Sequence, residues 1–151
     1  MNEVVTSNSI QSRRILVIDD EEANLLLLRT LLEREGYANV RYLSDPTKAV
    51  EELIDFEPHL ILLDLMMPQL DGYQLLEAFR RQASPDRFLP VLVLTADKTI
   101  EARRRALALG AKDFLSKPFD VIEIGLRIAN LLETQILYER LEARQANGST
   151  S

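Results

Sequence analysis

The chain has 151 residues, of which 46% are hydrophobic and none is cysteine, and this predicts one domain with a well-buried core. The lack of cysteine excludes disulfide scaffolds, thiolate zinc sites and thiol catalysis, and it is typical of a protein in a reducing cytoplasm. The net charge of −6 argues against direct nucleic-acid binding over a broad basic face. No apolar run could span a membrane, and residues 1–12 lack the basic start and apolar block of a signal peptide.

Three short, continuous apolar runs predict strands that are buried on both faces of a parallel sheet. Each run ends in a polar residue. The runs cover residues 15–18, 60–63 and 91–94, and the polar residues that follow them are Asp19, Asp64 and Thr95. Two weaker strands are expected at residues 39–43 and 113–116.

Helical patterns fill the gaps between these strands. Gly36 and Gly110 end two of them, Pro46 opens another, and Asp71 is a candidate N-cap. The expected helices cover residues 21–35, 46–56, 71–81, 99–109 and 120–145. Five strand–helix units in strict alternation predict an α/β domain with a doubly wound parallel sheet. We therefore expect a flexible leader at residues 1–12, the domain at 13–133, and a helical extension with a disordered tail at 134–151.

The polar residues after the strands predict a ligand site, because ligands of such sheets bind at the carboxyl ends of the strands. Asp19, Asp20 and Asp64 would lie close together and repel one another unless a cation were bound. Mg²⁺ prefers oxygen ligands and is usually held by one or two carboxylates and a phosphate. Thr95 and Lys117 would add a hydroxyl and a positive charge suited to phosphoryl oxygens. Each residue alone has a structural explanation, such as helix capping for the aspartate pair, but their joint placement favours a site.

Four motifs in this order resemble the receiver domains of two-component response regulators. The resemblance extends over residues 14–132 and rests on Ile-Leu-Val-Ile-Asp19-Asp20-Glu21, Leu62-Leu63-Asp64-Leu65-Met66-Met67-Pro68-Gln69-Leu70-Asp71-Gly72, Leu94-Thr95-Ala96 and Ser116-Lys117-Pro118-Phe119. It implies a flavodoxin-like five-stranded sheet in the order 2-1-3-4-5, flanked by five helices of which the last is extended.

The resemblance also implies roles for the acidic residues. Asp64 is expected to take a phosphoryl group from a sensor histidine kinase or a phosphotransfer protein. Mg²⁺ is the expected cofactor, with Asp20 and Asp64 as direct ligands, Asp19 as a ligand through water, and the main-chain carbonyl of Met66 as a further ligand. The protein would then be a phosphoacceptor that assists its own phosphorylation and dephosphorylation, and not an enzyme with a separate substrate.

A switch is implied as well. Lys117 and Thr95 would bind phosphoryl oxygens, and a cis peptide bond before Pro118 would aim Lys117 into the pocket. As Thr95 moves, Phe114 would turn inward and reshape the face formed by the fourth helix, the fifth strand and the fifth helix. The positions that tune the phosphoryl lifetime in this family correspond to Met66 and Asp97.

Three alternative functions compete with this one. An aspartyl phosphatase needs a second aspartate two residues after the first, and Met66 stands there. A flavin carrier needs a phosphate-binding loop after the first strand, where four acidic residues would repel a phosphate. A pseudo-receiver that acts as a protein-interaction module is the remaining alternative, although such domains tend to lose the acidic pair, the acceptor or the lysine.

The remaining features concern partners. His59 is interpreted as structural, and the three arginines at 103–105 either form a solvated helix face or contact a partner. The extended last helix resembles a signalling linker, so an effector domain outside this chain is one expectation. A homodimer through that helix, or through the switch face, is another. No contact with nucleic acid or a membrane is expected.

Overall fold

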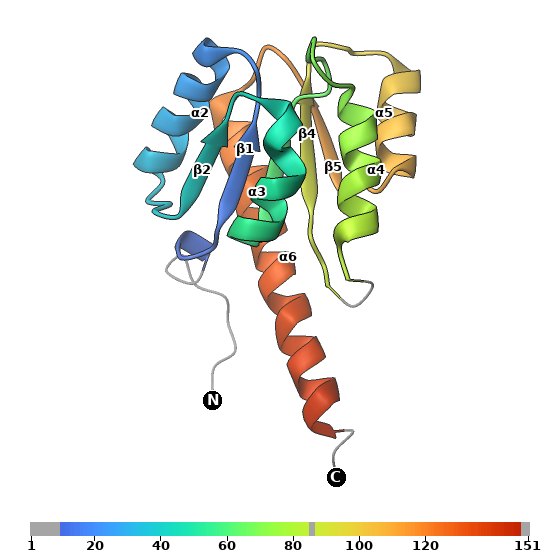
Figure 1. Ribbon diagram of the computed structural model, residues 1–151. Coiled ribbons are helices and arrows are strands. Elements are labelled where there is room, and N and C mark those ends of the chain that lie inside the picture. The colour runs from blue at the N-terminus through green and yellow to red at the C-terminus, as the bar shows by residue number, and fades with distance from the viewer. Residues whose placement is uncertain (1–9, 85–86, 149–151) are drawn as a thin grey trace.

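Five parallel strands form one sheet in the computed structural model, which describes residues 10–84 and 87–148 (Figure 1). The strands are β1 (Ile15–Ile18), β2 (Val40–Leu43), β3 (Leu60–Leu63), β4 (Val91–Thr95) and β5 (Asp113–Ser116). Their order is β2-β1-β3-β4-β5, which confirms the predicted topology. All five strands therefore end at the same edge of the sheet, drawn at the top of Figure 1.

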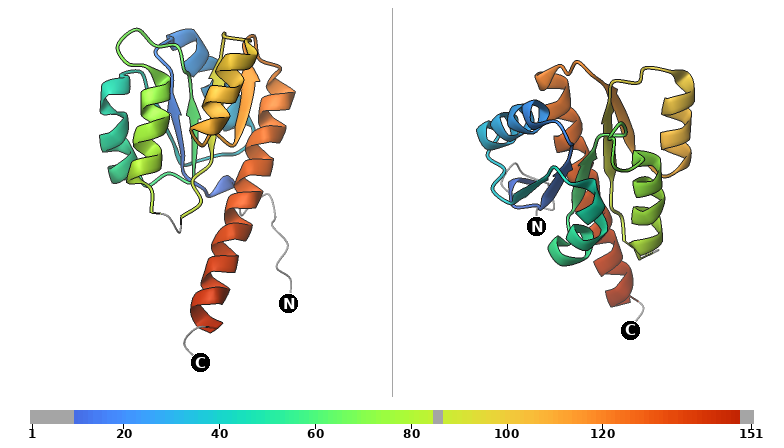
Figure 2. Two further views of the ribbon diagram at one scale, coloured as in Figure 1. Left: turned by 90° about the vertical axis from the view of Figure 1, so that its right-hand side faces the viewer. Right: turned by 45° about the horizontal axis from the view of Figure 1, so that its top comes forward.

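Helices cover both faces of this sheet (Figures 1 and 2). Their bounds are α2 (Glu22–Arg34), α3 (Ala49–Phe56), α4 (Gly72–Gln82), α5 (Ile100–Ala108) and α6 (Val121–Gly148). Helices α2 and α6 pack on one face, and α3, α4 and α5 pack on the other. The three-layer arrangement confirms the predicted α/β class.

Side-chain alternation along the strands explains why both faces need a cover. In β1, Ile15 and Val17 belong to the layer under α2 and α6, whereas Leu16 and Ile18 face α3 and α4. All four are at most 1% exposed. Burial of each such side chain contributes about 1.5–3 kcal/mol, so the continuous apolar runs favour a two-sided sheet.

The predicted cap at Asp71 is present, since Asp71 Oδ1 accepts a hydrogen bond from the Tyr73 amide at 2.9 Å. Thr99 caps α5 as well, although this role was not predicted from the sequence, and its Oγ1 accepts a hydrogen bond from the Ala102 amide at 3.2 Å. Gly36 ends α2 with a φ of 89°, a value that a side chain would disfavour. The predicted helix at 46–56 differs, because it begins with a 3₁₀ turn, η1 (Pro46–Lys48), before α3.

Both ends of the chain differ in part from the sequence-based expectation. Of the expected leader at 1–12, residues 1–9 lie outside the described residues, but Ile10 packs against the α2–α6 core and Gln11 donates to the Glu35 carbonyl at 2.6 Å. Helix α6 continues to Gly148, so Asn147 and Gly148 are helical and not part of a tail. The residues before them, mostly strong helix formers, explain the extra length. The rest of the expected tail, 149–151, is not described.

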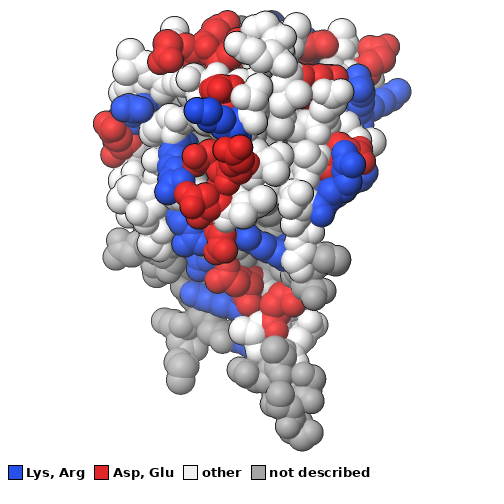
Figure 3. All heavy atoms as spheres, viewed as in Figure 1, with Lys and Arg blue, Asp and Glu red and all other residues white. Residues whose placement is uncertain are grey.

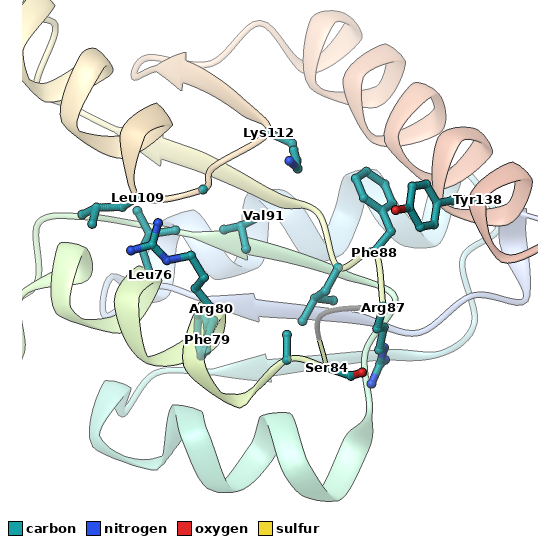
Figure 4. Close-up of a pocket in the computed structure, with 13 residues that line it drawn as sticks. Leu76, Phe79, Arg80, Ser84, Arg87, Phe88, Val91, Leu109, Lys112 and Tyr138 are labelled. Carbon is teal, nitrogen blue, oxygen red and sulfur yellow. The ribbon is translucent and has the colours of Figure 1, made fainter. Parts of the chain in front are cut away.

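The extension of α6 contacts the lower edge of the domain in Figure 1, and Figure 4 shows Tyr138 of this helix beside Phe88. Arg13 donates to Glu139 Oε2 at 2.8 Å and to Gln135 Oε1 at 3.3 Å, and Gln135 is only 3% exposed. The rings of Phe88, in the loop before β4, and Tyr138 are stacked with their centroids 5.2 Å apart. The helix is therefore part of the packed domain through about Glu139. Within the described part of the chain, no helix has the length and apolarity needed to cross a membrane.

Candidate functional site

The strand ends bring the predicted site residues together at the upper edge of the sheet in Figure 1. Asp19 follows β1, Asp64 follows β3, Thr95 ends β4 and Lys117 follows β5. Figure 3 shows acidic side chains along this edge. The parallel strand order thus places residues up to 98 positions apart in one pocket.

Three carboxylates form the centre of the site. One oxygen each from Asp19, Asp20 and Asp64 lies within 4.8 Å of the others. Asp19 and Asp64 are only 2% and 4% exposed, so water screens their repulsion poorly. Lys117 Nζ lies 3.2 Å from Asp19 Oδ2 and 3.2 Å from Asp64 Oδ2. One ammonium group thus contacts two of the three carboxylates, and the cluster keeps an excess of negative charge.

The electrostatics of Asp64 reflect this environment. The pKa of Asp64 is raised to about 6, mainly by burial and in addition by the carboxylate of Asp19, while the Met66 amide and Lys117 oppose the increase. For Lys117, burial lowers the pKa, but the carboxylates of Asp19 and Asp64 outweigh burial and raise it above its usual value. A cation that joined the cluster would favour the ionised form of Asp64.

Asp20 supplies an independent sign that the cluster suits a cation. Its Oδ1 atom is buried and has no hydrogen-bond partner within the described residues. A buried carboxylate oxygen without a donor is costly, and a metal ion would compensate that cost. The three carboxylates offer only oxygen atoms as metal ligands. This matches Mg²⁺, which selects hard ligands and retains several waters.

The backbone around Asp64 is fixed by short-range contacts. The Met66 amide donates to Asp64 Oδ1 at 3.1 Å, and the Gly72 amide donates to the Leu65 carbonyl at 3.1 Å. A Cβ atom on Gly72 would lie 2.5 Å from the Leu65 Cα, so only glycine permits this close approach. The Met66 side chain is 59% exposed. The loop after Asp64 and the start of α4 are thereby held as one unit.

Thr95 and Phe114 occupy neighbouring strands beneath the site. Thr95 is fully buried, its Oγ1 accepts from the Asp97 amide at 3.3 Å, and its carbonyl accepts from the Lys117 amide at 2.7 Å. The expected cis peptide bond between Lys117 and Pro118 is present. Phe114 is 6% exposed and belongs to the core that α3, α4 and α5 cover, so its ring points inward in this structure.

His59 lies at the opposite edge of the sheet, just before β3. Its Nδ1 accepts a hydrogen bond from the Arg14 amide at 2.9 Å. The pKa of His59 is lowered to about 4, mainly by burial and in addition by the charges of Arg14 and Arg13. The neutral ring therefore has a structural role there, as interpreted from the sequence.

Sequence reasoning missed one contact near the site. Arg105, treated as part of an exposed arginine run, lies with its guanidinium carbon 4.0 Å from the ring centroid of Tyr73 on α4. Its neighbour Arg103 lines a different cavity, beside Phe114 and Arg127. The run thus faces two sides of α5, and no local sequence signal pairs Arg105 with a residue 32 positions earlier.

Comparisons with known proteins agree with this geometry. The sequence profile described as "Response regulator receiver domain" matches residues 15–129. Response regulator PleD of Caulobacter vibrioides is 36% identical over 137 residues, which are 91% of this chain and 30% of PleD. The alkaline phosphatase synthesis transcriptional regulatory protein PhoP of Bacillus subtilis is 38% identical over 121 residues, 80% of this chain and 49% of PhoP.

Solved structures give the same result. The Francisella response regulator 1452 receiver domain superposes with a TM-score of 0.73 at 29% identity, over 82% of this chain and 98% of that one. The chain spans between about a third and a half of the length of PleD and PhoP. The profile match, the relatives and the acidic pocket at the strand ends lead to one conclusion: the chain belongs to the response regulator receiver domain family.

Proposed function

We propose that the protein is a phosphorylation-operated switch in which Asp64 is the phosphoacceptor. An Asp64 carboxylate oxygen would attack the phosphorus of a phosphohistidine on a sensor kinase or phosphotransfer protein. The phosphorus–nitrogen bond breaks, its electron pair stays on the imidazole, and an acyl phosphate forms. The observation that carries the proposal is the buried trio of Asp19, Asp20 and Asp64 beside Lys117.

A bound Mg²⁺ would neutralise charge on the transferring phosphoryl group. Asp20 and Asp64 would bind it directly, Asp19 through water, and the main-chain carbonyl of Met66 would add a ligand. The buried Asp20 oxygen without a partner among the described residues supports this assignment. The protein's own contribution is to orient Asp64, which the Met66 amide already holds by a hydrogen bond.

Lys117 and Thr95 would bind the phosphoryl oxygens of the modified Asp64. Lys117 Nζ contacts Asp64 now, so it needs little movement to reach an oxygen attached to that carboxylate. Thr95 and Phe114 would carry the change to the face formed by α5, β5 and α6. A groove of about 330 Å³ on this face is lined by Phe114, Pro118 and Arg103, among others, and it would change shape with the switch.

The pseudo-receiver alternative is less well supported. It predicts that the acidic pair, the acceptor or the lysine is lost, but all four residues are present, and the contacts of Lys117 with Asp19 and Asp64 join them in one cluster. A purely structural cluster would also be expected to leave no carboxylate oxygen without a partner.

The partners follow from the same proposal. A sensor histidine kinase or phosphotransfer protein would supply the phosphoryl group in the cytoplasm. The output would be an effector domain beyond this chain, since PleD and PhoP are longer, or a homodimer through the α5–β5–α6 face or the extension of α6. We propose no direct contact with nucleic acid or a membrane by these residues.

Intact-mass spectrometry after incubation with acetyl phosphate tests the proposal. The wild-type protein should gain one phosphoryl group only when Mg²⁺ is present, and Asp64→Asn should gain none. Glu133→Gln, which changes the same charge on an exposed helix face, is the matched control and should be modified as wild type. Modification of the Asp64→Asn variant, or no modification of wild type even with a cognate kinase, would refute the assignment and favour the pseudo-receiver.

A further inference from the structure

Helix α5 is attached to the domain by few side chains. Only Ala102 and Ala106 of its nine residues are buried, and two alanine side chains bury little apolar area. Thr95 ends β4 in the Asp64 pocket, and Asp97 lies in the loop that joins Thr95 to α5. What fixes α5 therefore also sets how easily this loop moves.

The contact between Arg105 and Tyr73 is a tie between α5 and α4. The guanidinium carbon lies 4.0 Å from the ring centroid, well within the range of a cation–π interaction. Burial raises the pKa of Tyr73, Asp97 raises it further and Arg105 opposes the increase, so the phenol lies near charges from both the loop and α5. Tyr73 and Asp97 also line one cavity together with Leu65 and Met66.

Tyr73 is the residue of this pair whose backbone is more firmly held. Asp71 caps its amide, and the preceding Gly72 packs against the Leu65 backbone with no space for a side chain. Because Leu65 follows Asp64 directly, Tyr73 is fixed to the segment that bears the phosphoacceptor. Arg105 lies on α5, the helix that has few buried side chains.

We propose that Arg105 and Tyr73 form a latch that positions α5 and the β4–α5 loop relative to Asp64, and that this latch belongs to the switched conformation. The proposal rests on the proposed phosphoacceptor function. The direction follows from Phe114, whose ring is buried while the latch is formed, since inward rotation of this ring is the expected response to phosphorylation. Both residues are positioning residues, because they act through the loop and touch no reacting atom.

The chain offers matched variants for a test. Tyr73→Phe keeps the ring and should preserve the latch, whereas Tyr73→Leu removes the ring at similar volume. Arg105→Gln removes the charge from the latch. Arg104→Gln removes the same charge from the same helix at an exposed position and serves as the control.

Hydrogen exchange of α5 amides gives the first readout, and it is measured with Mg²⁺ and saturating beryllofluoride, a phosphoryl mimic that favours the switched conformation to which the latch is assigned. Loss of an exposed cation–π pair should accelerate exchange about two- to fivefold in Tyr73→Leu and Arg105→Gln, with Tyr73→Phe and Arg104→Gln unchanged. The double variant Tyr73→Leu/Arg105→Gln should show no further acceleration, because the single changes break the same contact. Unchanged exchange in the single variants, or additive effects in the double variant, would overturn the latch.

Titration with beryllofluoride and Mg²⁺ gives the second readout, which a merely structural contact would not change. Because the latch is assigned to the switched conformation, the two disrupting variants should bind beryllofluoride about two- to fivefold more weakly, with the controls as wild type. Equal or tighter binding would overturn the assigned role. If wild type itself bound none, the phosphoacceptor function would fail and the role assigned to the switched conformation would fail with it. Exchange of α5 amides in the unliganded variants would then show whether the contact between Arg105 and Tyr73 alone holds α5.

Discussion

Replacing Asp64 by asparagine is expected to stabilise the protein at pH 8 when metal is removed with EDTA. The pKa of about 6 in the folded protein lies roughly two units above the ordinary value of 3.8, mainly because the carboxyl group is buried. At about 1.36 kcal/mol per unit, the ionised side chain costs about 3 kcal/mol of folding free energy. Asparagine keeps the shape and lacks the charge.

The sign of the pH dependence follows from the raised pKa. Between pH 3.8 and 6 the folded state holds more protons than the unfolded state, so the stability of the wild type decreases as the pH rises. The favourable contribution of Asp64 is fully present below pH 3.8 and is lost as the pH rises through about 6. The advantage of the variant should therefore be largest above pH 7 and disappear toward pH 4.

Urea unfolding in EDTA at several pH values measures this difference. In thermal unfolding, a stability difference of about 3 kcal/mol between the variant and the wild type corresponds to roughly 6–12 °C in melting temperature for a chain of this length. Glu133→Gln, at an exposed position of α6, controls for the change in net charge. Equal or lower stability of Asp64→Asn at pH 8, or a difference independent of pH, would refute the electrostatic account of the site.

Two further predictions concern the lower edge of the domain. His59 has a pKa lowered to about 4, so its contribution to stability is present above pH 6.5 and about 3 kcal/mol is lost as the pH falls through 4. The variant His59→Asn keeps an acceptor for the Arg14 amide. Measured by urea unfolding, its free energy of unfolding should decrease less than that of the wild type between pH 7 and pH 4. An equal decrease in the two proteins would contradict this prediction. Tyr138→Leu removes the stacking on Phe88, which stabilises the packed extension of α6 by about 1 kcal/mol. It should speed amide exchange at residues 134–140 about fivefold, and unchanged exchange would show that the stacking does not hold the extension.

Local sequence patterns were sufficient to predict the strands and most helix ends. The runs at 15–18 and 60–63 are apolar at every position, and only a sheet covered on both faces buries such a run. The cap at Asp71 was also predictable, because a cap bonds an amide two or three residues away. The site residues Asp19, Asp64, Thr95 and Lys117 could be grouped because parallel strands end at one edge.

The tertiary structure decided what depends on contacts between distant residues. The burial of the Asp20 oxygen, the packing of Ile10 and the fastening of α6 by Arg13 join segments that no short-range pattern links. The latch between Tyr73 and Arg105 is of the same kind, since an arginine on a helix has the same local sequence whether it faces water or a ring. The order of residues along the chain determined the sheet and the edge at which the candidate site lies. Packing in three dimensions determined which charged groups are buried and which residues they contact.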